Sequence, residues 1–282
     1  LIQMKEKVLK NLQTFAKGIF VPVLILPIVG ILFAFASIFT NSRVYNLIPF
    51  LNNGVFINFG KILGQSLIPI IGTYLGILFT VGIAIGMAKK EKHYAALVAM
   101  LSYFVFIHSM NVYMGIQNLI LPLSELRGSG HTIMMGIQII DMGIFLGIAL
   151  GLIVAYVHNK FIDVELKGAL QIYGGSRLVF IVLSFTMILL AIISTHIWPI
   201  VQHGINTLSI FIESTGVFGI FTYGFLDRIL IPTGLHHLIY PTFLYTNFGG
   251  SEMVEVIQNG EKVSVLFEGA RNIYNAQLSN ID

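Results

Sequence analysis

Residues 18–39 read GIFVPVLILPIVGILFAFASIF, from Gly18 to Phe39, and contain no charged side chain. A transmembrane helix needs roughly 20 predominantly apolar residues, so this stretch is long enough to cross a bilayer. It is also longer than the apolar part of a secretion signal and has no cleavage site after it. The stretch therefore predicts a membrane protein that begins with a basic, amphipathic segment at residues 1–17.

The composition of the whole chain supports a membrane protein. Hydrophobic residues make up 56% of the 282 residues and charged residues only 10%, whereas a soluble domain averages about 25% charged residues. The net charge of +3 comes from short basic clusters between apolar runs, which argues against a nucleic-acid partner because such a partner needs a basic face. The absence of cysteine excludes disulfides, thiolate nucleophiles and cysteine-based metal sites.

The apolar runs predict an all-α polytopic fold with about six transmembrane helices in residues 18–228. The second run carries Pro69 and several glycines, so it is either strongly tilted or a broken pair. A seventh run, residues 229–248, contains Pro232 and Pro241 and predicts a re-entrant hairpin. Residues 249–282 are polar and predict an extramembrane loop or small hairpin around Asn259-Gly260. The six runs are 18–39, 62–88, 94–113, 136–158, 178–200 and 205–225.

Basic residues orient these spans. With the N-terminus in the cytoplasm, ten Lys and Arg residues fall in cytoplasmic segments and only two in the opposite loops. That asymmetry is the positive-inside pattern of membrane proteins. The cytoplasmic set is Lys5, Lys7, Lys10, Lys17, Lys89, Lys90, Lys92, Lys160, Lys167 and Arg177, and the opposite set is Arg43 and Arg127.

The main candidate for a solute site is the segment 224–237, which reads GFLDRILIPTGLHH. Ionisable groups at membrane depth are unfavourable unless they are paired or line a wet cavity. Backbone broken by proline and glycine is tolerated there only where protein or water satisfies it. We expect His236 and His237 to bind sugar hydroxyls, because an imidazole offers one donor and one acceptor. Thr233 and Gly234 belong to the same candidate site.

Five further residues have a functional and a structural reading. Arg228 either faces the solute path and a phosphoryl donor or is an edge charge that snorkels. Asp141 either contacts substrate or pairs with a helix N-terminus or a polar neighbour. The turn at Gly174, Gly175 and Arg177 either binds an anion or caps a helix.

Other polar and small residues have simpler readings. The glycine-rich stretches at 72–86 and 143–151 predict packing faces between helices. Five histidines near span ends are interpreted as interfacial. No histidine or carboxylate pattern at helical spacing predicts a metal site, and no cofactor is expected. The five histidines are His108, His131, His158, His196 and His203.

Several motifs in order resemble one family, the sugar-permease (IIC) subunits of the bacterial phosphotransferase system, glucose and glucoside superfamily. The segment 224–237 is similar to that family's GFxxRLLIPTGLHH signature. Residues 22–30, PVLILPIVG, resemble PVxxLPxxG, and residues 81–88, VGIAIGMA, match VGIAIGxA. Residues 141–145, DMGIF, resemble DxGVFGGI, residues 174–179, GGSRLV, resemble GGxRFVP, and Trp198-Pro199 falls where the family has IWP.

The resemblance carries several implications. Residues 267–278, FEGARNIYNAQL, are similar to the EGARNIxFAQL loop of the α-glucoside and maltose branch, which adds Glu268 to the candidate site. The family is dimeric through its N-terminal helices and lies in the bacterial cytoplasmic membrane. Its phosphoryl donor is a phospho-cysteine on a IIB domain. Since this chain has no cysteine, we expect the donor on another domain or chain.

One departure from the family leaves alternatives open. The family continues to a second hairpin with a GITEPIEF-type motif, whose Glu contacts the phosphorylated hydroxyl, while this chain ends at Asp282. We therefore expect a fragment or truncated product. The alternatives are an ion-coupled secondary sugar transporter using Asp141 or Glu213, or an inactive fragment. The sequence does not favour a membrane hydrolase, because neither HExxH nor GxSxG occurs.

Overall fold

The structure is a computed structural model in which the chain forms two units. The first comprises residues 1–120 and 132–194, and the second comprises 121–131 and 195–282. The residues described are 2–41, 44, 47–71, 73–126, 129–215, 217–230, 251–258, 261–269, 273–274 and 276–277.

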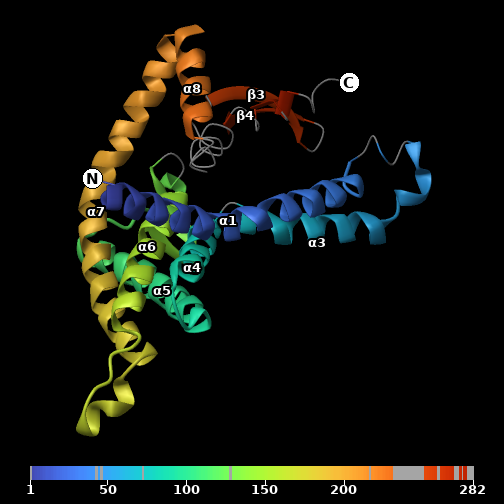
Figure 1. Ribbon diagram of the computed structural model, residues 1–282. Helices are drawn as coiled ribbons and strands as arrows, with labels where there is room; N and C mark the ends of the chain where they lie inside the picture. The colour runs from blue at the N-terminus through green and yellow to red at the C-terminus, as the bar shows by residue number, and fades with distance from the viewer. Residues whose placement is uncertain are drawn as a thin grey trace. The chain divides into compact units, whose positions relative to one another are not determined.

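The first unit begins with a long helical hairpin. Helix α1 (Ile2–Ile38) and helix α3 (Gly54–Ile71) lie side by side and antiparallel, joined through the short 3-10 helix η1 (Pro49–Leu51) (Figure 1). Phe39 fixes the closed end of this hairpin, because its ring lies 5.1 Å from that of Phe35, 6.1 Å from Phe56 and 5.6 Å from Phe59 between centroids. Aromatic pairs at such spacings stabilise by about 0.5–1.5 kcal/mol each beyond their buried area.

The second apolar run is a broken pair of helices. Helix α3 ends at Ile71, and helix α4 (Leu75–Met87) continues at an angle of 59° to it. Pro69 lies in the last turn of α3, and proline weakens the ladder of backbone hydrogen bonds around it. One of the two sequence predictions for this run, the broken pair, is therefore confirmed.

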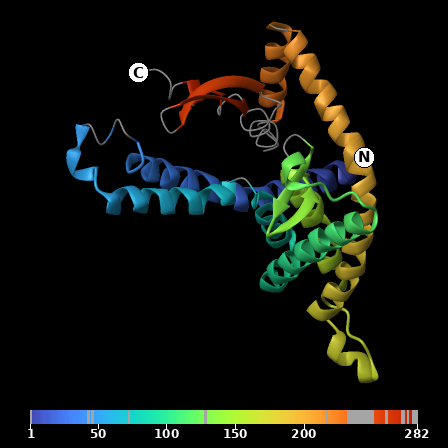
Figure 2. The same ribbon diagram turned by 180° about the vertical axis from the view of Figure 1, so that it is seen from behind.

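Helices α4, α5 (Lys92–Ile116) and α6 (Gly143–Phe161) pack into a bundle that both views show (Figures 1 and 2). The backbones of α4 and α6 meet directly. A Cβ atom placed on Gly147 of α6 would clash with the carbonyl oxygen of Gly76 and lie 2.8 Å from Cβ of Phe79. Thr80 Oγ1 joins the two helices, since it lies 2.9 Å from the Gly76 oxygen and 3.3 Å from the Gly147 oxygen. The predicted glycine packing faces are thus confirmed.

Helix α1 packs against α4 by the same principle. A Cβ atom on Gly82 would lie only 2.5 Å from Cδ of Pro22, and one on Gly18 would lie 3.2 Å from the Cα atom of Ile83. Small residues let helices approach closely where lipid gives no hydrophobic driving force between them. The segments 18–30 of α1 and 81–88 of α4 therefore pack closely against one another at these glycines.

The fourth predicted span starts later than expected. Residues 136–140 belong to a hairpin of strands β1 (His131–Met134) and β2 (Ile137–Ile140), and α6 begins only at Gly143. Met135 (φ 52°) and Gly136 (φ 81°) form the turn, and two successive positive φ values are the geometry of a type I′ hairpin. Asn111 of α5 donates to the carbonyl oxygen of Gln138 at 2.7 Å, which holds the hairpin against α5.

The fifth and sixth runs are not separated where the sequence suggested. Helix α7 runs unbroken from Ser176 to Ser214, through Pro199 and residues 201–204, which were expected to connect two spans. The next helix, α8 (Val217–Leu230), has 14 residues and so is about 21 Å long, shorter than the roughly 30 Å bilayer core. A proline-containing apolar helix is tolerated where neighbouring groups satisfy its backbone.

The second unit also contains the 3-10 helix η2 (Leu123–Glu125) and a β-hairpin. Strands β3 (Ser251–Gln258) and β4 (Glu261–Glu268) pair antiparallel, with Val254 opposite Val265 and Gln258 opposite Glu261. That register confirms the small hairpin predicted around Asn259-Gly260, although those two residues lie outside the described ones. Gln277 Nε2 donates to both carboxylate oxygens of Glu252, at 3.1 and 3.0 Å.

Four described helices are long and apolar enough to cross a membrane, and five if the bent α3–α4 pair counts as one span. They lie in α1, α5, α6 and α7, at residues 13–38, 92–116, 143–161 and 176–204. The polytopic, mostly helical architecture agrees with the prediction. The predicted count of six is not confirmed, and the predicted hairpin at 229–248 lies almost entirely outside the described residues.

The α4–α6 contact gives a stability prediction. We expect Gly147→Ala to destabilise the protein by about 1–3 kcal/mol, because an added methyl group overpacks a site with no free volume. The control is Gly115→Ala in α5, where nothing lies within 4 Å of the added atom, and alanine favours the helix by up to about 1 kcal/mol. Thermal unfolding in detergent, followed by size-exclusion recovery, compares them. Equal midpoints for the two variants would contradict the close contact.

Candidate functional site

The predicted sugar-binding residues fall in two groups. Thr233, Gly234, His236 and His237 lie outside the described residues, so their role stays a prediction. Arg228, Arg177 and Asp141 are described, and each is in a different part of the chain. Glu268 is the last residue of β4, opposite Ser251.

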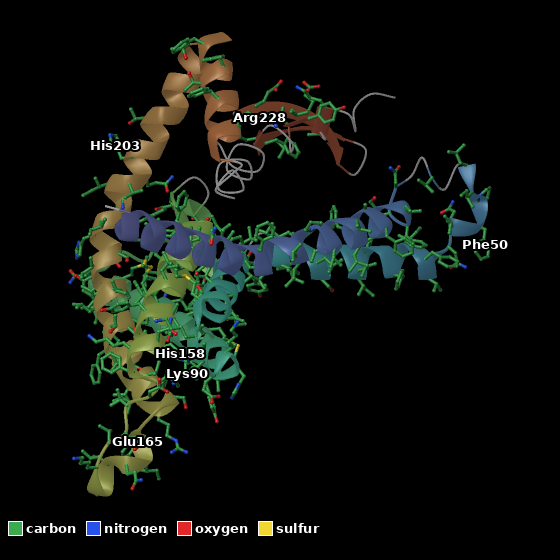
Figure 3. The ribbon with its side chains drawn as sticks, in the orientation of Figure 1. Phe50, Lys90, His158, Glu165, His203 and Arg228 are labelled. Carbon is green, nitrogen blue, oxygen red and sulfur yellow. The ribbon has the colours of Figure 1, made fainter. Side chains whose placement is uncertain are left out.

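Arg228 lies in the last turn of α8, exposed and directly before the predicted hairpin (Figure 3). It continues the helix face that carries Phe218, Phe221 and Phe225, because residues spaced by three and four share a face. The rings of Phe218 and Phe221 are 6.4 Å apart and those of Phe221 and Phe225 are 6.0 Å apart. An aromatic stripe thus leads along α8 to a guanidinium group that is suited to bind an oxyanion or a hydroxyl.

Asp141 caps the start of α6. Its Oδ1 atom accepts a hydrogen bond of 2.9 Å from the backbone N–H of Gly143. Part of its surface is exposed, but the protein atoms crowded around it raise the carboxyl pKa, and the bond from Gly143 acts in the opposite direction. A carboxylate at a helix N-terminus is favoured by the helix dipole. The structure therefore supplies one of the structural partners that the sequence suggested for Asp141.

Arg177 is bound to its own loop. Its Nη1 atom donates to the carbonyl oxygen of Ile172 at 2.5 Å, and the N–H of Gly175 donates to the Val164 oxygen at 3.2 Å. These bonds close the turn before α7. Of the two readings of the Gly174–Arg177 turn, the geometry favours the structural one.

A cluster that the sequence did not reveal lies where the end of α6 meets the loop between α4 and α5. Asn159 binds that loop twice, since its Oδ1 accepts from the N–H of Lys89 at 2.8 Å and its Nδ2 donates to the Met87 oxygen at 2.9 Å. His158 Nε2 lies 2.9 Å from the Lys90 oxygen (Figure 3). Because a carbonyl only accepts, this nitrogen carries the proton.

His158 lies in the last turn of α6, near the end of a candidate span as the sequence suggested, but its side chain has no exposed surface. Its Nδ1 atom is buried and has no hydrogen-bond partner among the described residues. One indirect signal is present in the sequence, because a histidine next to an asparagine at the end of an apolar span offers several hydrogen-bond donors and acceptors. Only the fold brings that pair to the Lys89–Lys90 backbone.

The ion pair beside this cluster is exposed to solvent. Lys90 Nζ lies 2.8 Å from Asp163 Oδ2, with side chains 64% and 66% exposed. Exposed pairs stabilise by about 0–1 kcal/mol because solvent screens them. The side-chain bonds from Asn159 and His158 to the loop backbone, rather than this pair, fix the position of the loop.

No group of three or more His, Asp or Glu side chains gathers as metal ligands would within the part of the chain that the structure describes. In the second unit, His131 at the start of β1 has its pKa lowered by burial.

The motifs of the sequence have clear structural positions. Pro22 and Gly82, from two of them, touch each other, and Gly143, from a third, has its carbonyl oxygen against Gly76. These three motifs form the packed junction of α1, α4 and α6. The fourth, with Gly175 and Arg177, forms the turn before α7.

A comparison with known protein families identifies the family to which this chain belongs. The family described as "Phosphotransferase system, EIIC" matches residues 16–280. The chain belongs to the EIIC family of the phosphotransferase system. The resemblance of the sequence motifs is thereby confirmed, and members of this family are integral membrane permeases.

Curated EIIC relatives carry names that specify sugars. The "PTS system maltose-specific EIICB component" of Bacillus subtilis (strain 168) is 33% identical over 242 residues, covering 84% of this chain and 45% of the relative. The "PTS system alpha-glucoside-specific EIICB component" of Leptotrichia buccalis is 34% identical with the same coverage. The maltose-specific protein of Escherichia coli (strain K12) is 32% identical over 274 residues, covering 95% of this chain and 49% of the relative. The chain thus spans about half the length of these relatives.

The Asn159 cluster gives a second prediction. We expect Asn159→Ala to raise the hydrogen-exchange rate of the Lys89 amide by about 5–30-fold, since it removes hydrogen bonds worth about 1–2 kcal/mol to local opening. Lys90→Ala, which removes only the exposed ion pair, should change that rate less than about threefold. Mass spectrometry of peptides covering residues 87–92 measures both. A larger effect of Lys90→Ala would mean that charge, not the Asn159 hydrogen bonds, holds the loop.

Proposed function

We propose that this chain is the membrane-embedded part of a sugar permease that binds a glucose-type sugar and presents it for phosphorylation. The observation that carries the proposal is the EIIC family match over residues 16–280. The helical bundle agrees, because its spans pack through glycines and its described loops are tied down by side-chain bonds to the backbone. Such a scaffold positions a substrate, which is most of what phosphoryl transfer requires of a protein.

The sugar is an α-glucoside, with maltose as the first candidate. The relatives are named for maltose and alpha-glucoside at 32–34% identity. Within this chain, the FEGARNIYNAQL segment at residues 267–278 supports the same class. His236, His237, Thr233 and Gly234 bind the hydroxyls, with Arg228 at the entrance of the same segment.

The donor is a phosphorylated cysteine of a IIB domain, which the "EIICB" names of the relatives include. In the transfer, the sulfur–phosphorus bond breaks, the sugar hydroxyl oxygen bonds to phosphorus, and the hydroxyl proton passes to a base. These 282 residues contain no cysteine, so the thiol belongs to another part of the system. The role of the described helices is to hold the sugar and exclude water.

We place the protein in the bacterial cytoplasmic membrane as a homodimer, with the N-terminus inside. The ten-to-two distribution of basic residues supports this orientation. The contacts between Lys89, Lys90 and the end of α6 place the loop after α4 and the loop after α6 at one end of the bundle. That arrangement agrees with both loops being cytoplasmic.

An ion-coupled transporter is the alternative from the same class of membrane proteins. It would need Asp141 or Glu213 as an exchangeable site. Asp141 instead accepts a hydrogen bond from the Gly143 backbone and caps α6. That use of Asp141 favours the phosphotransferase. Uptake of unmodified sugar without any phosphorylated partner would favour the ion-coupled transporter instead.

We expect His236→Ala or His237→Ala in the full-length permease to weaken maltose binding by about 1–3 kcal/mol, because a bound hydroxyl loses its partner. Titration calorimetry measures the affinity. His203→Ala is the control, since His203 is an exposed residue of α7 (Figure 3) and its loss should leave the affinity unchanged. If both mutants bind maltose as the wild type does, the pair is structural.

The orientation gives a further prediction. The chain is naturally free of cysteine, so Glu91→Cys provides a single label site in the loop after α4. We expect an impermeant thiol reagent to label this residue in inside-out vesicles and not in intact cells. Leu123→Cys, in η2 within the segment that follows α5 in the chain, should show the reverse pattern. Labelling of position 91 from outside would overturn the proposed orientation.

A further inference from the structure

The loop between α6 and α7 exposes large apolar side chains outside the membrane-spanning segments. The candidate span of α6 ends at Phe161 and that of α7 begins at Ser176. Between them, the 3-10 helix η3 (Gly168–Tyr173) has no buried residue. Irregular backbone exposed to lipid does not occur in the hydrocarbon core, so this segment lies outside it.

Three side chains of η3 form an apolar patch, which we call the η3 patch. Leu170 is 59% exposed, Ile172 is 61% exposed and Tyr173 is 49% exposed. Isolated exposed apolar residues are common, whereas three large exposed apolar side chains within four residues of one short segment are a local concentration. Aromatic and large aliphatic residues with a charged rim are the composition of protein interfaces.

Hydrogen bonds within the loop between α6 and α7 hold its backbone in a fixed shape. The N–H of Gly175 donates to the Val164 oxygen at 3.2 Å, and the N–H of Gly174 to the Gln171 oxygen at 3.1 Å. Arg177 clamps the oxygen of Ile172. These bonds present the η3 patch to the outside in a fixed shape, which lowers the entropy that a partner must remove on binding.

The direction of the loop distinguishes a protein partner from the bilayer surface. It projects past the ends of α4 and α5, with Glu165 labelled near its tip (Figure 3), and the view from behind agrees (Figure 2). A segment bound to the membrane interface would lie in the plane of the helix ends with its apolar face toward the lipid. The η3 patch instead stands away from those ends.

The charges around the loop between α6 and α7 favour a partner with a negatively charged surface. Residues 89–92 and 158–177 carry six Lys and Arg side chains against three carboxylates, and one of those carboxylates, Asp163, is bound by Lys90. An excess of positive charge attracts an anionic surface and speeds its association. The phosphoryl group of a phosphorylated protein domain carries that charge.

We propose that the η3 patch, with its basic surroundings, is the docking surface for the phosphorylated IIB domain. The inference rests on the proposed function and adds to it the surface through which the donor is recognised. Leu170, Ile172 and Tyr173 supply the apolar centre, and Lys160 and Lys167 supply the charged rim. Tyr and large apolar residues are the groups that carry most of the binding energy in interfaces.

The kinetic test uses the full-length permease with the phosphorylated IIB domain added as a separate protein. Leu170→Glu combined with Ile172→Glu should raise the KM for the IIB domain by about tenfold or more, while maltose affinity stays at the wild-type value. The matched control is Leu123→Glu, which changes a leucine that is 78% exposed in another 3-10 helix, η2. That control should leave both quantities unchanged. An unchanged KM in the double variant overturns the docking surface.

A spectroscopic test does not depend on turnover. Ile172→Cys, labelled with an environment-sensitive fluorophore, should shift to the blue when the IIB domain is added to permease in vesicles. A blue shift on moving from detergent to vesicles without IIB would assign the patch to the bilayer, and a shift that follows permease concentration would assign it to a second copy. Either result overturns the proposal. If the wild type forms no sugar phosphate, the proposed function fails, whereas the fluorophore still reports whether the IIB domain docks.

Discussion

The direct contact between the backbones of α4 and α6 is the constraint on which the first unit depends. Gly147 stands against the carbonyl oxygen of Gly76, and the hydroxyl of Thr80 is shared between the oxygens of Gly76 and Gly147. In a bilayer, helices gain little from burying apolar side chains against each other, so close packing and interhelical hydrogen bonds hold them together. Helix α1 repeats the principle on α4 through Pro22 and Gly82.

Side-chain bonds to backbone close both ends of this bundle. At one end, Asn159 and His158 bind the loop between α4 and α5. At the other, Asp141 caps α6 and Asn111 holds the β1–β2 hairpin. Each of these polar groups satisfies a backbone group that would otherwise be unpaired near the membrane, where an unpaired group is strongly unfavourable. The main role of these polar side chains is therefore to stabilise the ends of the bundle.

The sequence predicted the elements whose signals are local. The apolar runs located α1, α5 and the broken α3–α4 pair, and the Asn259-Gly260 turn signal located the β3–β4 hairpin. The start of α6 was misplaced because residues 136–140 are as apolar as the helix that follows, and periodicity alone does not separate a short buried strand from a helix end. The length of α7 was missed because Pro199 and Gly204 usually interrupt helices.

The candidate site was predicted in a different way. His158 and Asn159 became recognisable as a cluster only when the fold brought them to the Lys89–Lys90 backbone, since their contacts join residues about 70 positions apart. Arg177 and Asp141 had two readings each, and their partners are backbone groups that a sequence does not display. The histidine pair at 236–237 was found from chemistry in an unusual apolar setting, and its role remains a prediction.

The shared bond of Thr80 has a mechanical consequence. Sliding α6 along α4 by one residue would replace Gly147 with Leu146 or Ile148 against the Gly76 oxygen, and no side chain fits there. Shear between these helices is thereby blocked, so they move as one rigid block. The 59° bend between α3 and α4 sets the direction in which α3 leaves this block.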